Sequence, residues 1–337
     1  MGVMRALVKD HRGQSGATVQ DVPIPNPGPG QIRLKVSATG ICGTDLHIMD
    51  DEYPVSLPVV VGHEVTGVVD AVGDAVAAEN IGRRVSIETY YATCGSCQYC
   101  REGQQNLCAD RRSIGTHVNG GFAEYVVVPA INAHDVHPSV GRYAGALYEP
   151  LSCVAHALCD PSVASPGDNA VVVGPGAMGL LAAQVLAAEG ASVTVAGLAT
   201  DRARLLTAEQ LGFRALEVPA LGEVSPRADV VVDCSGAAAG VATALRWARR
   251  GGRYVQIGLC GKAVPVDLDL VCLHELIVTS GFASTPRSWR RAEMLVAAGL
   301  VRLGPLVSDV LPLSNWDKAV SRARAGDGVK LMLEPSP

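Results

Sequence analysis

Three features are missing from this chain of 337 residues, and each absence excludes a class of protein. There is no excess of positive charge: the net charge is −5 and no sustained basic run occurs, which argues against a nucleic-acid-binding surface. No apolar run reaches the roughly 18 residues that a membrane span requires. The N-terminal stretch Met1–Arg5 lacks the apolar core of a signal peptide. We therefore expect a cytoplasmic protein that binds neither nucleic acid nor membranes.

What is present indicates an ordinary globular protein. The hydrophobic fraction of 48% and the charged fraction of 18% are typical of that class. The length predicts two domains, each large enough for its own core. Ten cysteines are present, and without an export signal they favour thiolate–metal sites over disulfides.

The chain changes character near Pro150. Before it, short strands alternate with turns, as at 3–9, 31–38 and 65–72. After it come strands and helices in alternation, with strands expected at 170–173, 192–196, 229–233 and 253–258 and helices at 177–189, 201–211 and 237–249. This alternation predicts a doubly wound parallel sheet built from βαβ units. After about residue 282 the alternation ends, and we expect the chain to rejoin the first domain.

One crossover of the predicted sheet is too short for a helix. Between the strand expected near 214–218 and the next strand, only residues 219–228 remain, and Pro219 and Pro226 interrupt them. We expect a loop in place of the usual crossover helix.

A glycine-rich turn follows the strand at 170–173. Gly174, Gly176 and Gly179 form the pattern Gly-x-Gly-x-x-Gly, and an apolar segment with helical spacing begins with Ala177 and Met178. In this context the first glycine makes a tight turn, the second allows a pyrophosphate to approach, and the third lets the helix pack on the strand. Free N–H groups at the helix start then face the phosphates. We predict a dinucleotide site here rather than an ordinary turn.

Four of the cysteines lie within fifteen residues. Cys94, Cys97, Cys100 and Cys108 can close a tetrahedral Zn²⁺ shell that leaves no open position, so the metal would fix the loop and take no part in chemistry. An iron–sulfur cluster and a loop of free thiols are the alternatives. The spacing differs from the known iron–sulfur patterns, and no proline follows Cys108. The pattern therefore favours structural zinc.

A second set of metal-binding residue types is more dispersed. Cys42 is expected in a turn after the strand that ends near residue 38, His63 and Glu64 follow some twenty residues later, and Glu149 stands at the border of the α/β region. Sulfur, nitrogen and oxygen ligands together are typical of zinc sites that keep one position open. Taken singly, each residue could instead be a packing, turn or surface residue.

These motifs together resemble the zinc-dependent medium-chain alcohol dehydrogenases, in the branch of sorbitol, polyol and threonine dehydrogenases. The resemblance covers roughly residues 5–335 and rests on Cys42-Gly43-Thr44-Asp45, Gly62-His63-Glu64, the four-cysteine segment, Gly120-Gly121-Phe122-Ala123-Glu124-Tyr125, Glu149-Pro150-Leu151 and the glycine turn. It implies a β-rich GroES-like catalytic domain made of residues 1–149 and 282–337, around a Rossmann domain at 150–281. It also implies a homodimer or homotetramer, formed partly by the apolar strand near 276–282.

The resemblance also implies roles for the site residues. Cys42, His63 and Glu64 would be ligands of a catalytic zinc, with Glu149 close enough to ligate it or to hold its water, which makes two zinc ions per chain. Zinc would act as a Lewis acid on the substrate hydroxyl while hydride passes to a nicotinamide. Thr44 and His47 would pass the released proton to solvent through the cofactor ribose.

The end of the second predicted strand bears on the choice of cofactor. NAD-binding sheets normally carry an acidic residue there, but this chain has Gly197, and Arg202 follows as a possible donor to a 2′-phosphate. We therefore favour NADP over NAD. Lys330, from the returning segment, is expected to reach the cofactor phosphates.

The substrate is defined only by class. Where the sorbitol branch has an Arg-Tyr pair, this chain has Ala283-Ser284 after Phe282, which argues against sorbitol and leaves polyols, cyclitols and sugar-derived secondary alcohols. A threonine or amino-alcohol dehydrogenase is an alternative enzyme. A non-catalytic nucleotide-binding protein on the same scaffold is the alternative from another class.

Overall fold

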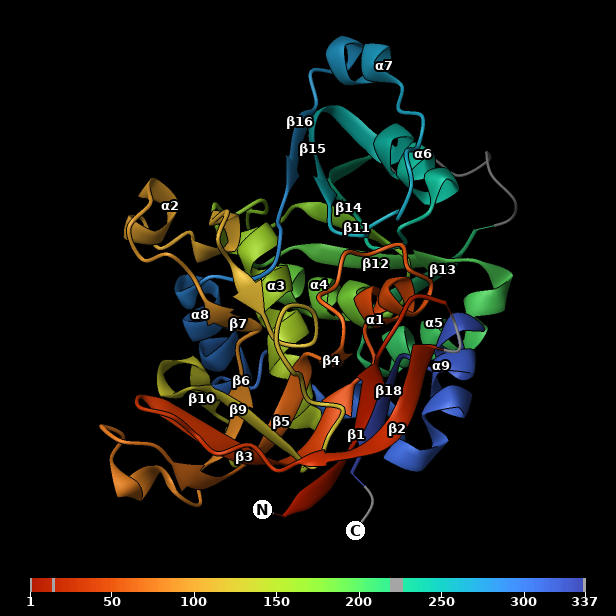
Figure 1. Cartoon of the computed structure of the whole chain (residues 1–337). Helices are drawn as coiled ribbons and strands as arrows, with labels where there is room; N and C mark the ends of the chain where they lie inside the picture. The colour runs from red at the N-terminus through yellow and green to blue at the C-terminus, as the bar shows by residue number, and fades with distance from the viewer. Residues whose placement is uncertain (1, 14–15, 219–226, 336–337) are drawn as a thin grey trace. The chain divides into compact units, whose positions relative to one another are not determined.

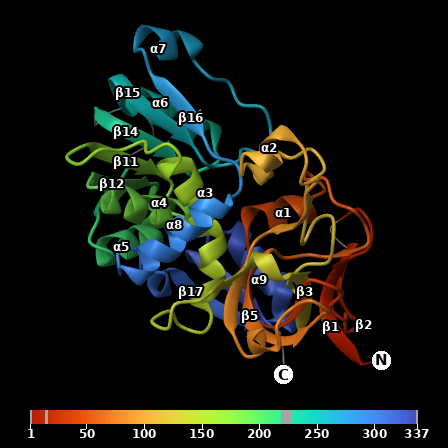
Figure 2. The same ribbon diagram turned by 90° about the vertical axis from the view of Figure 1, so that its left-hand side faces the viewer.

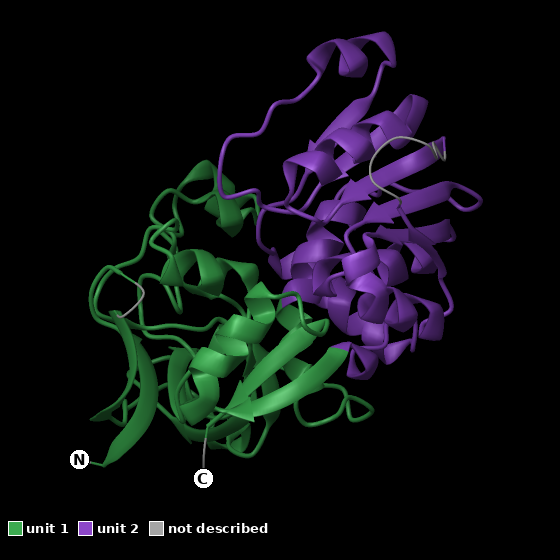
Figure 3. Ribbon diagram, turned by 90° about the vertical axis from the view of Figure 1, so that its right-hand side faces the viewer, with its two compact units in different colours: residues 1–149, 307–337 green, residues 150–306 purple. Residues whose placement is uncertain are grey.

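The computed structural model describes residues 2–13, 16–218 and 227–335 and divides the chain into two compact units. Unit 1 comprises residues 1–149 and 307–337, and unit 2 comprises residues 150–306, shown in two colours in Figure 3. The first division lies between Glu149 and Pro150. The second lies after residue 306, whereas we expected it after residue 281.

The segment 282–306 joins unit 2 through polar contacts with the rest of that unit. Helix α8 (Pro286–Ala297) buries Trp289 completely, and the indole Nε1 donates to Ser284 Oγ at 3.0 Å. The backbone N–H of Arg302 donates to the side chain of Gln184 in helix α4 (Ala177–Ala188) at 2.7 Å. The bond between Arg302 and Gln184 joins residues 118 positions apart, so no local sequence pattern reports it.

Unit 1 is rich in strands (Figure 1). Its first sheet has the order β2-β1-β4, and its largest sheet has the order β10-β6-β5-β3-β18-β17, with β9 also paired to β3; β7 and β8 form a separate pair. The strands are β1 Val3–Lys9, β2 Ala17–Pro23, β3 Gln31–Gly40, β4 Val59–Val60, β5 Glu64–Val72, β6 Arg84–Ile87, β7 Tyr90–Ala92, β8 Arg112–Ser113, β9 Tyr125–Pro129, β10 Ala133–Asp135, β17 Val307–Pro312 and β18 Lys330–Glu334. The helices of this unit are α1 Gly43–Met49, α2 Gln98–Arg101 and α9 Trp316–Arg324.

Alternating residues create the core of the large sheet. In β3, Ile32, Leu34 and Val36 are buried, and the more exposed Arg33 and Lys35 lie between them. Such a period of two is what a half-buried strand requires. A second cluster joins Leu7 of β1 to Ile48 and Met49 of α1 and to Leu331 and Leu333 of β18. This cluster seats α1, the helix that follows Cys42.

Helix α1 corrects one expectation. We expected residues 42–47 to form a turn, but Cys42 is the N-cap of a short helix that runs from Gly43 to Met49. The helix forms because Ile48 and Met49 are buried on one side of it and because Asp45 accepts a hydrogen bond from the backbone N–H of Cys42 at 2.9 Å.

Unit 2 contains the predicted parallel sheet. The strand order is β13-β12-β11-β14-β15-β16, and all neighbours are parallel. The strands are β11 Asn169–Val173, β12 Ser192–Gly197, β13 Arg214–Glu217, β14 Ala228–Asp233, β15 Ala248–Gln256 and β16 Ile277–Ser280. The helices are α3 Tyr148–Cys159 (whose first two residues fall in unit 1), α4, α5 Arg202–Gln210, α6 Ala238–Trp247, α7 Leu268–Leu273 and α8.

The direction of winding reverses next to β11. The chain moves outward through β12 and β13 and then returns to add β14, β15 and β16 on the other side of β11. Figure 2 shows the helices of this unit beside the sheet. Such a reversal opens a crevice at the carboxyl ends of the strands, which is where doubly wound folds bind ligands.

Two local predictions for unit 2 concern the start of strand β15, which we expected at residue 253, and the loop at 219–228. Strand β15 starts at Ala248, directly after α6, because an irregularity that contains Gly251 (φ +68°) separates its first bridge from the regular pairing that begins at Arg253. The loop predicted at 219–228 lies outside the described residues except for its last two. Within the described ranges, no helix is long and apolar enough to cross a bilayer.

Candidate functional site

The residues predicted to hold the catalytic metal come together in unit 1. Strands β3 and β5 pair antiparallel with Gly40 opposite Glu64, so Cys42, just after β3, meets His63, just before β5. The ligand-type atoms of Cys42, His63 and Glu64 lie within 4.8 Å of one another. His63 and Glu64 are buried, and Cys42 is partly exposed. A thiolate, an imidazole and a carboxylate at this spacing fit a zinc ion that keeps an open position.

Asp45 belongs to this site, although its position in the sequence did not lead us to predict it as a site residue. Its side chain is buried; Oδ2 accepts from the Cys42 N–H, and Oδ1 lies 3.4 Å from Nδ1 of His63. A carboxylate behind a metal-binding histidine orients the ring and leaves the other nitrogen for the metal. An acidic residue three positions after an N-cap is a capping-box signal, and that signal could have identified it.

The charges around His63 favour a cation. Burial lowers the pKa of His63, but the charges of Asp45 and Cys42 more than offset this effect and raise the pKa well above its ordinary value. The same negative groups would stabilise a metal ion at this position.

Lys330 does not have the surroundings that we predicted for a contact with cofactor phosphates. Its Nζ lies 2.7 Å from both carboxylate oxygens of Glu64 and donates to the carbonyl oxygen of Ile41 at 3.1 Å, and the residue is buried. Strand β18 pairs with β3, and this pairing places Lys330 beside the predicted metal ligands. The ammonium therefore neutralises a buried carboxylate beside the candidate metal position.

Gly40 makes room for this arrangement. A Cβ atom at residue 40 would overlap Oε2 of Glu64, so no larger residue fits without displacing the carboxylate. The glycine is thus required by close approach to a side chain on the neighbouring strand.

Glu149 is not among the three residues whose ligand-type atoms lie within 4.8 Å of one another. It is buried, and its Oε1 accepts a hydrogen bond from Thr89 Oγ1 at 2.7 Å. Its charge also contributes to the raised pKa of Lys330, so both belong to the same buried region. That Glu149 ligates the catalytic zinc or holds its water stays a prediction.

The two predicted proton carriers lie on α1. Thr44 Oγ1 is 3.7 Å from Cys42 Sγ. His47 Nδ1 lies 2.6 Å from Glu52 Oε2, and the imidazole is partly exposed. The helix therefore extends from Cys42, the predicted metal ligand, to a histidine whose side chain is 28% exposed.

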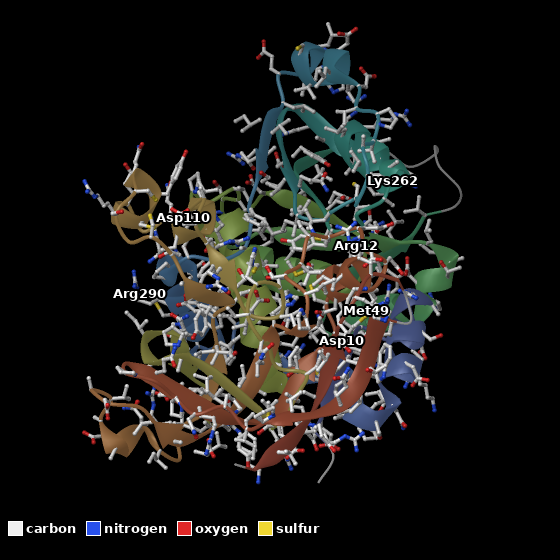
Figure 4. The ribbon with its side chains drawn as sticks, viewed as in Figure 1. Asp10, Arg12, Met49, Asp110, Lys262 and Arg290 are labelled. Carbon is white, nitrogen blue, oxygen red and sulfur yellow. The ribbon has the colours of Figure 1, made fainter. Side chains whose placement is uncertain are left out.

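The four cysteines form a second cluster in unit 1. Their sulfur atoms all lie within 4.8 Å of one another; Cys94 Sγ is 3.9 Å from Cys100 Sγ and 3.7 Å from Cys108 Sγ. A tetrahedral shell with Zn–S bonds of about 2.3 Å has S–S edges of about 3.8 Å, so the cluster fits zinc. N–H groups of Ser96 and Cys97 lower the pKa of Cys94 to about 6, which favours the thiolate that a metal binds. Asp110, labelled in Figure 4, comes two residues after the last cysteine.

Replacing Cys97 with serine should abolish zinc binding by the four-cysteine cluster and loosen the segment, and it leaves Cys42 and His63 unchanged. Structural zinc contributes on the order of 10 kcal/mol in small sites, and this segment contains little other core. We expect trypsin to cleave after Arg101 at least about tenfold faster than in the parent protein. Cys272→Ser, an exposed thiol on α7, is the control. Unchanged cleavage with two zinc ions still bound would contradict the prediction.

The glycine turn in unit 2 has the expected local geometry. Gly174 has a φ of +99°, and a Cβ at Gly179 would overlap the carbonyl oxygen of Gly174. Gly176 is the N-cap of α4, and a Cβ there would meet nothing within 4 Å. Ala177 and Met178 are the first two residues of that helix. The turn therefore leaves open space in front of the helix N-terminus, where a phosphate would bind.

The position that usually selects NAD is closed to side chains. Gly197 ends β12, and a Cβ there would lie 2.8 Å from Cγ of Pro175 in the glycine turn. Asp201 instead accepts from the N–H of Leu198 at 3.1 Å and lies 3.4 Å from Arg204, as a helix-capping residue would. Arg202, the first residue of α5, is exposed.

Comparison with known proteins agrees with both units. Residues 28–138 match the alcohol dehydrogenase GroES-like domain, and residues 177–298 match the zinc-binding dehydrogenase domain. The chain is 36% identical to sorbitol dehydrogenase of Halalkalibacterium halodurans (98% of this chain and 99% of the relative) and 32% identical to L-threonine 3-dehydrogenase of Bacillus velezensis (99% of each). A solved zinc-binding dehydrogenase from Sinorhizobium meliloti, bound to NADP, is 33% identical with a TM-score of 0.90, over 99% of this chain and 100% of that one.

Proposed function

Since this chain belongs to the zinc-dependent medium-chain alcohol dehydrogenase family, we propose that it oxidises a secondary alcohol of the polyol type and uses NADP as the hydride acceptor. The family makes it a zinc- and NAD(P)-dependent oxidoreductase that acts on a small-molecule alcohol. The substrate class, the preferred cofactor and the roles of single residues are proposals.

The observation that carries the proposal is the group formed by Cys42, His63 and Glu64, with Asp45 behind the histidine. Bound here, zinc would supply a Lewis acid that lowers the pKa of a substrate hydroxyl, and a nicotinamide would accept the hydride. A non-catalytic protein on this scaffold would have no need of a mixed ligand set with an open position.

The chain's own residues would carry the proton away. Thr44 lies beside the metal ligand Cys42 and can accept the hydroxyl proton and donate its own. His47 then takes up the proton at one ring nitrogen, while Glu52 holds the other nitrogen at 2.6 Å. Because the imidazole of His47 is partly exposed, it can release the proton to water.

The substrate proposal rests on what replaces the Arg-Tyr pair of the sorbitol branch. Ser284 is buried and accepts from Trp289, so its hydroxyl is engaged within unit 2. Ala283 has no polar side chain to hold a substrate hydroxyl. The identity to a sorbitol dehydrogenase still supports a polyol, cyclitol or sugar-derived alcohol.

A threonine dehydrogenase is the second candidate. The sequence Cys42-Gly43-Thr44-Asp45-Leu46-His47 is shared with that branch, and the Bacillus velezensis relative supports it. The absence of an acid at Gly197 argues against it, because that branch usually has one there.

A substrate panel tests the proposal. We expect kcat/KM for the best polyol, cyclitol or sugar alcohol to exceed that for L-threonine at least about tenfold, which corresponds to 1.4 kcal/mol of transition-state binding. A preference for threonine, or no turnover of any secondary alcohol by the zinc-loaded protein, would refute it.

NADP should bind more tightly than NAD. Arg202 is exposed at the start of α5, where it can donate to a 2′-phosphate, and no carboxylate at residue 197 opposes that phosphate. We expect Arg202→Ala to weaken NADP binding about tenfold, since a charged hydrogen bond contributes about 1.5–3 kcal/mol, while NAD binding stays unchanged. Fluorescence titration of both cofactors measures this, with exposed Arg250→Ala as control. Tighter binding of NAD by the parent protein would contradict the proposal.

We also propose a homo-oligomer that pairs through β16. This strand is the last in its sheet, and Ile277 and Val278 are 53% and 51% exposed. Exposed apolar edge strands invite pairing with another chain. Sedimentation of a monomer at micromolar concentration would exclude this.

A further inference from the structure

Lys9 is a cation inside the core of unit 1. It ends β1, the central strand of the β2-β1-β4 sheet, where it lies opposite Ala17 and Val59, and its side chain is 0% exposed. A buried ammonium is unfavourable unless its charge is balanced and its N–H groups find acceptors. The structure must therefore give this lysine specific partners.

Three oxygen atoms surround the Lys9 ammonium. Nζ lies 2.9 Å from Asp51 Oδ1 and 3.3 Å from each of two carbonyl oxygens, those of Met49 and Gly13. The other oxygen of Asp51 accepts from the Gly13 N–H at 2.6 Å. An ammonium has three donors, and here all three are used. Figure 4 labels Met49 near Asp10 and Arg12, which follow Lys9 in the chain.

One of these acceptors is the last carbonyl of helix α1. A helix leaves its last four carbonyl groups without partners inside the helix. In α1 the first three of them accept backbone N–H groups beyond the helix: Leu46 O from Asp50, His47 O from Glu52 and Ile48 O from Asp51, at 2.9–3.2 Å. The fourth, Met49 O, accepts from Lys9. Lys9 thus completes the C-terminal end of α1, where a positive charge also suits the helix dipole.

Asp51 is held in an unusual backbone conformation. Its φ is +59°, in the left-handed region that residues other than glycine seldom adopt. Such a conformation persists where surrounding contacts determine it, and here the contacts are those to Lys9 and Gly13. The residue therefore ends the helix and supplies the counter-charge of the buried lysine.

The position of α1 matters because of what it carries. The helix spans only two turns, a length that is not stable alone in water, so its ends must be held from outside. Cys42 is its N-cap, and Asp45 in its first turn lies against His63. A shift of the helix would move Cys42 and Asp45 relative to His63 and Glu64. Glu64 is the first residue of β5, and His63 immediately precedes it.

We propose that Lys9 is a positioning residue for the metal site: by closing the C-terminal end of α1 together with Asp51, it holds Cys42 and Asp45 at the distance from His63 that a zinc ion needs. The inference rests on the proposed function of that site. It assigns Lys9 no contact with substrate or metal.

Release of zinc from the holoenzyme tests this, since the four-cysteine cluster in the same unit serves as an internal reference. Zinc released to a chelator is followed with time in the parent protein and in Lys9→Met, and Cys42→Ala identifies the phase that belongs to Cys42 and His63. Methionine matches lysine in length and suits a buried site, and Asp51 keeps the Gly13 N–H and its contact with water. We expect release from the Cys42 site to quicken about tenfold, as for other residues that support metal ligands, with the cysteine-cluster phase unchanged.

Two further variants define the outcome. Arg324→Met removes an ion-pair partner of Asp50 at the same end of α1. Arg324 is 36% exposed, and this ion pair joins it to a side chain and not to a helix carbonyl, so release should stay at the parent rate. In Asp51→Asn, the asparagine can adopt the same left-handed conformation but lacks the negative charge that balances Lys9. This variant should also release zinc from the Cys42 site faster. It replaces Lys9→Met if that variant fails to fold. Equal acceleration of both phases, or of neither, overturns the inference. A parent protein that holds only the cysteine-cluster zinc overturns the proposed function as well.

Discussion

Cys42→Ala should lower kcat/KM about a thousandfold and reduce bound zinc from two ions per chain to one. The thiolate is one of three ligand groups within 4.8 Å, and a metal at that point contributes several kcal/mol of transition-state stabilisation. At 1.36 kcal/mol for each tenfold change in rate, loss of the metal removes about three orders of magnitude. Zinc analysis by emission spectrometry and initial rates with the best alcohol measure the two effects.

The control for Cys42→Ala is Cys272→Ala, which removes an exposed thiol from α7 in unit 2. It should leave both the zinc content and the rate unchanged. The Cys42 variant should also keep the thermal stability that comes from the four-cysteine cluster, because its sulfur atoms form a separate group. Full turnover by Cys42→Ala, or two zinc ions still bound, would exclude Cys42 as a ligand of the catalytic metal.

Lys330→Met should destabilise metal-free unit 1 by about 3–5 kcal/mol. The ammonium lies 2.7 Å from both oxygens of Glu64, and both side chains are almost fully buried. Removing one partner leaves a buried charge without compensation, which costs far more than the pair itself contributes. Thermal unfolding should shift by about 10 °C. Zinc bound at this site would supply a second positive charge beside Glu64, so the loss should be smaller in the zinc-loaded protein.

A double variant tests whether charge is the cause. Glu64→Gln added to Lys330→Met removes both charges and should recover more than half of the lost stability in the metal-free protein. If Lys330→Met unfolds within 2 °C of the parent protein without metal, the ion pair does not have this role. A double variant no more stable than Lys330→Met would show that lost packing, not charge, is responsible.

The same pair predicts a pH dependence. Burial lowers the pKa of Lys330, but Glu64 and then Cys42 raise it by more, so the pKa lies above its ordinary value. A group whose pKa is raised on folding contributes stability below its unfolded pKa and loses it as the pH rises through the folded value. The free energy of unfolding of the parent protein should therefore exceed that of Lys330→Met by a constant amount from about pH 6 to 9. This excess should shrink only above about pH 10.4.

Features set by neighbouring residues were predictable from the sequence. The spacing of Cys94, Cys97, Cys100 and Cys108 is enough to predict their cluster, because four thiols in one short segment can reach a common point without help from the rest of the chain. The glycine turn was predictable for the same reason: Gly174, Gly176 and Gly179 act on a strand, a turn and a helix that follow one another directly. The alternation of strand and helix patterns after Pro150 likewise predicted the parallel sheet of unit 2.

The tertiary structure alone decided which side chains surround the predicted metal ligands Cys42, His63 and Glu64. Lys330 is 266 positions from Glu64 and reaches it only because β18 pairs with β3, a pairing that no local pattern reports. Lys9 meets Met49 through the same kind of distant contact, and the segment 282–306 joins unit 2 through the bond between Arg302 and Gln184. Residue type and spacing determine which chemistry a short segment can perform. Strand register and packing between distant segments decide which charges are buried together, because a charge removed from water is stable only beside its partner.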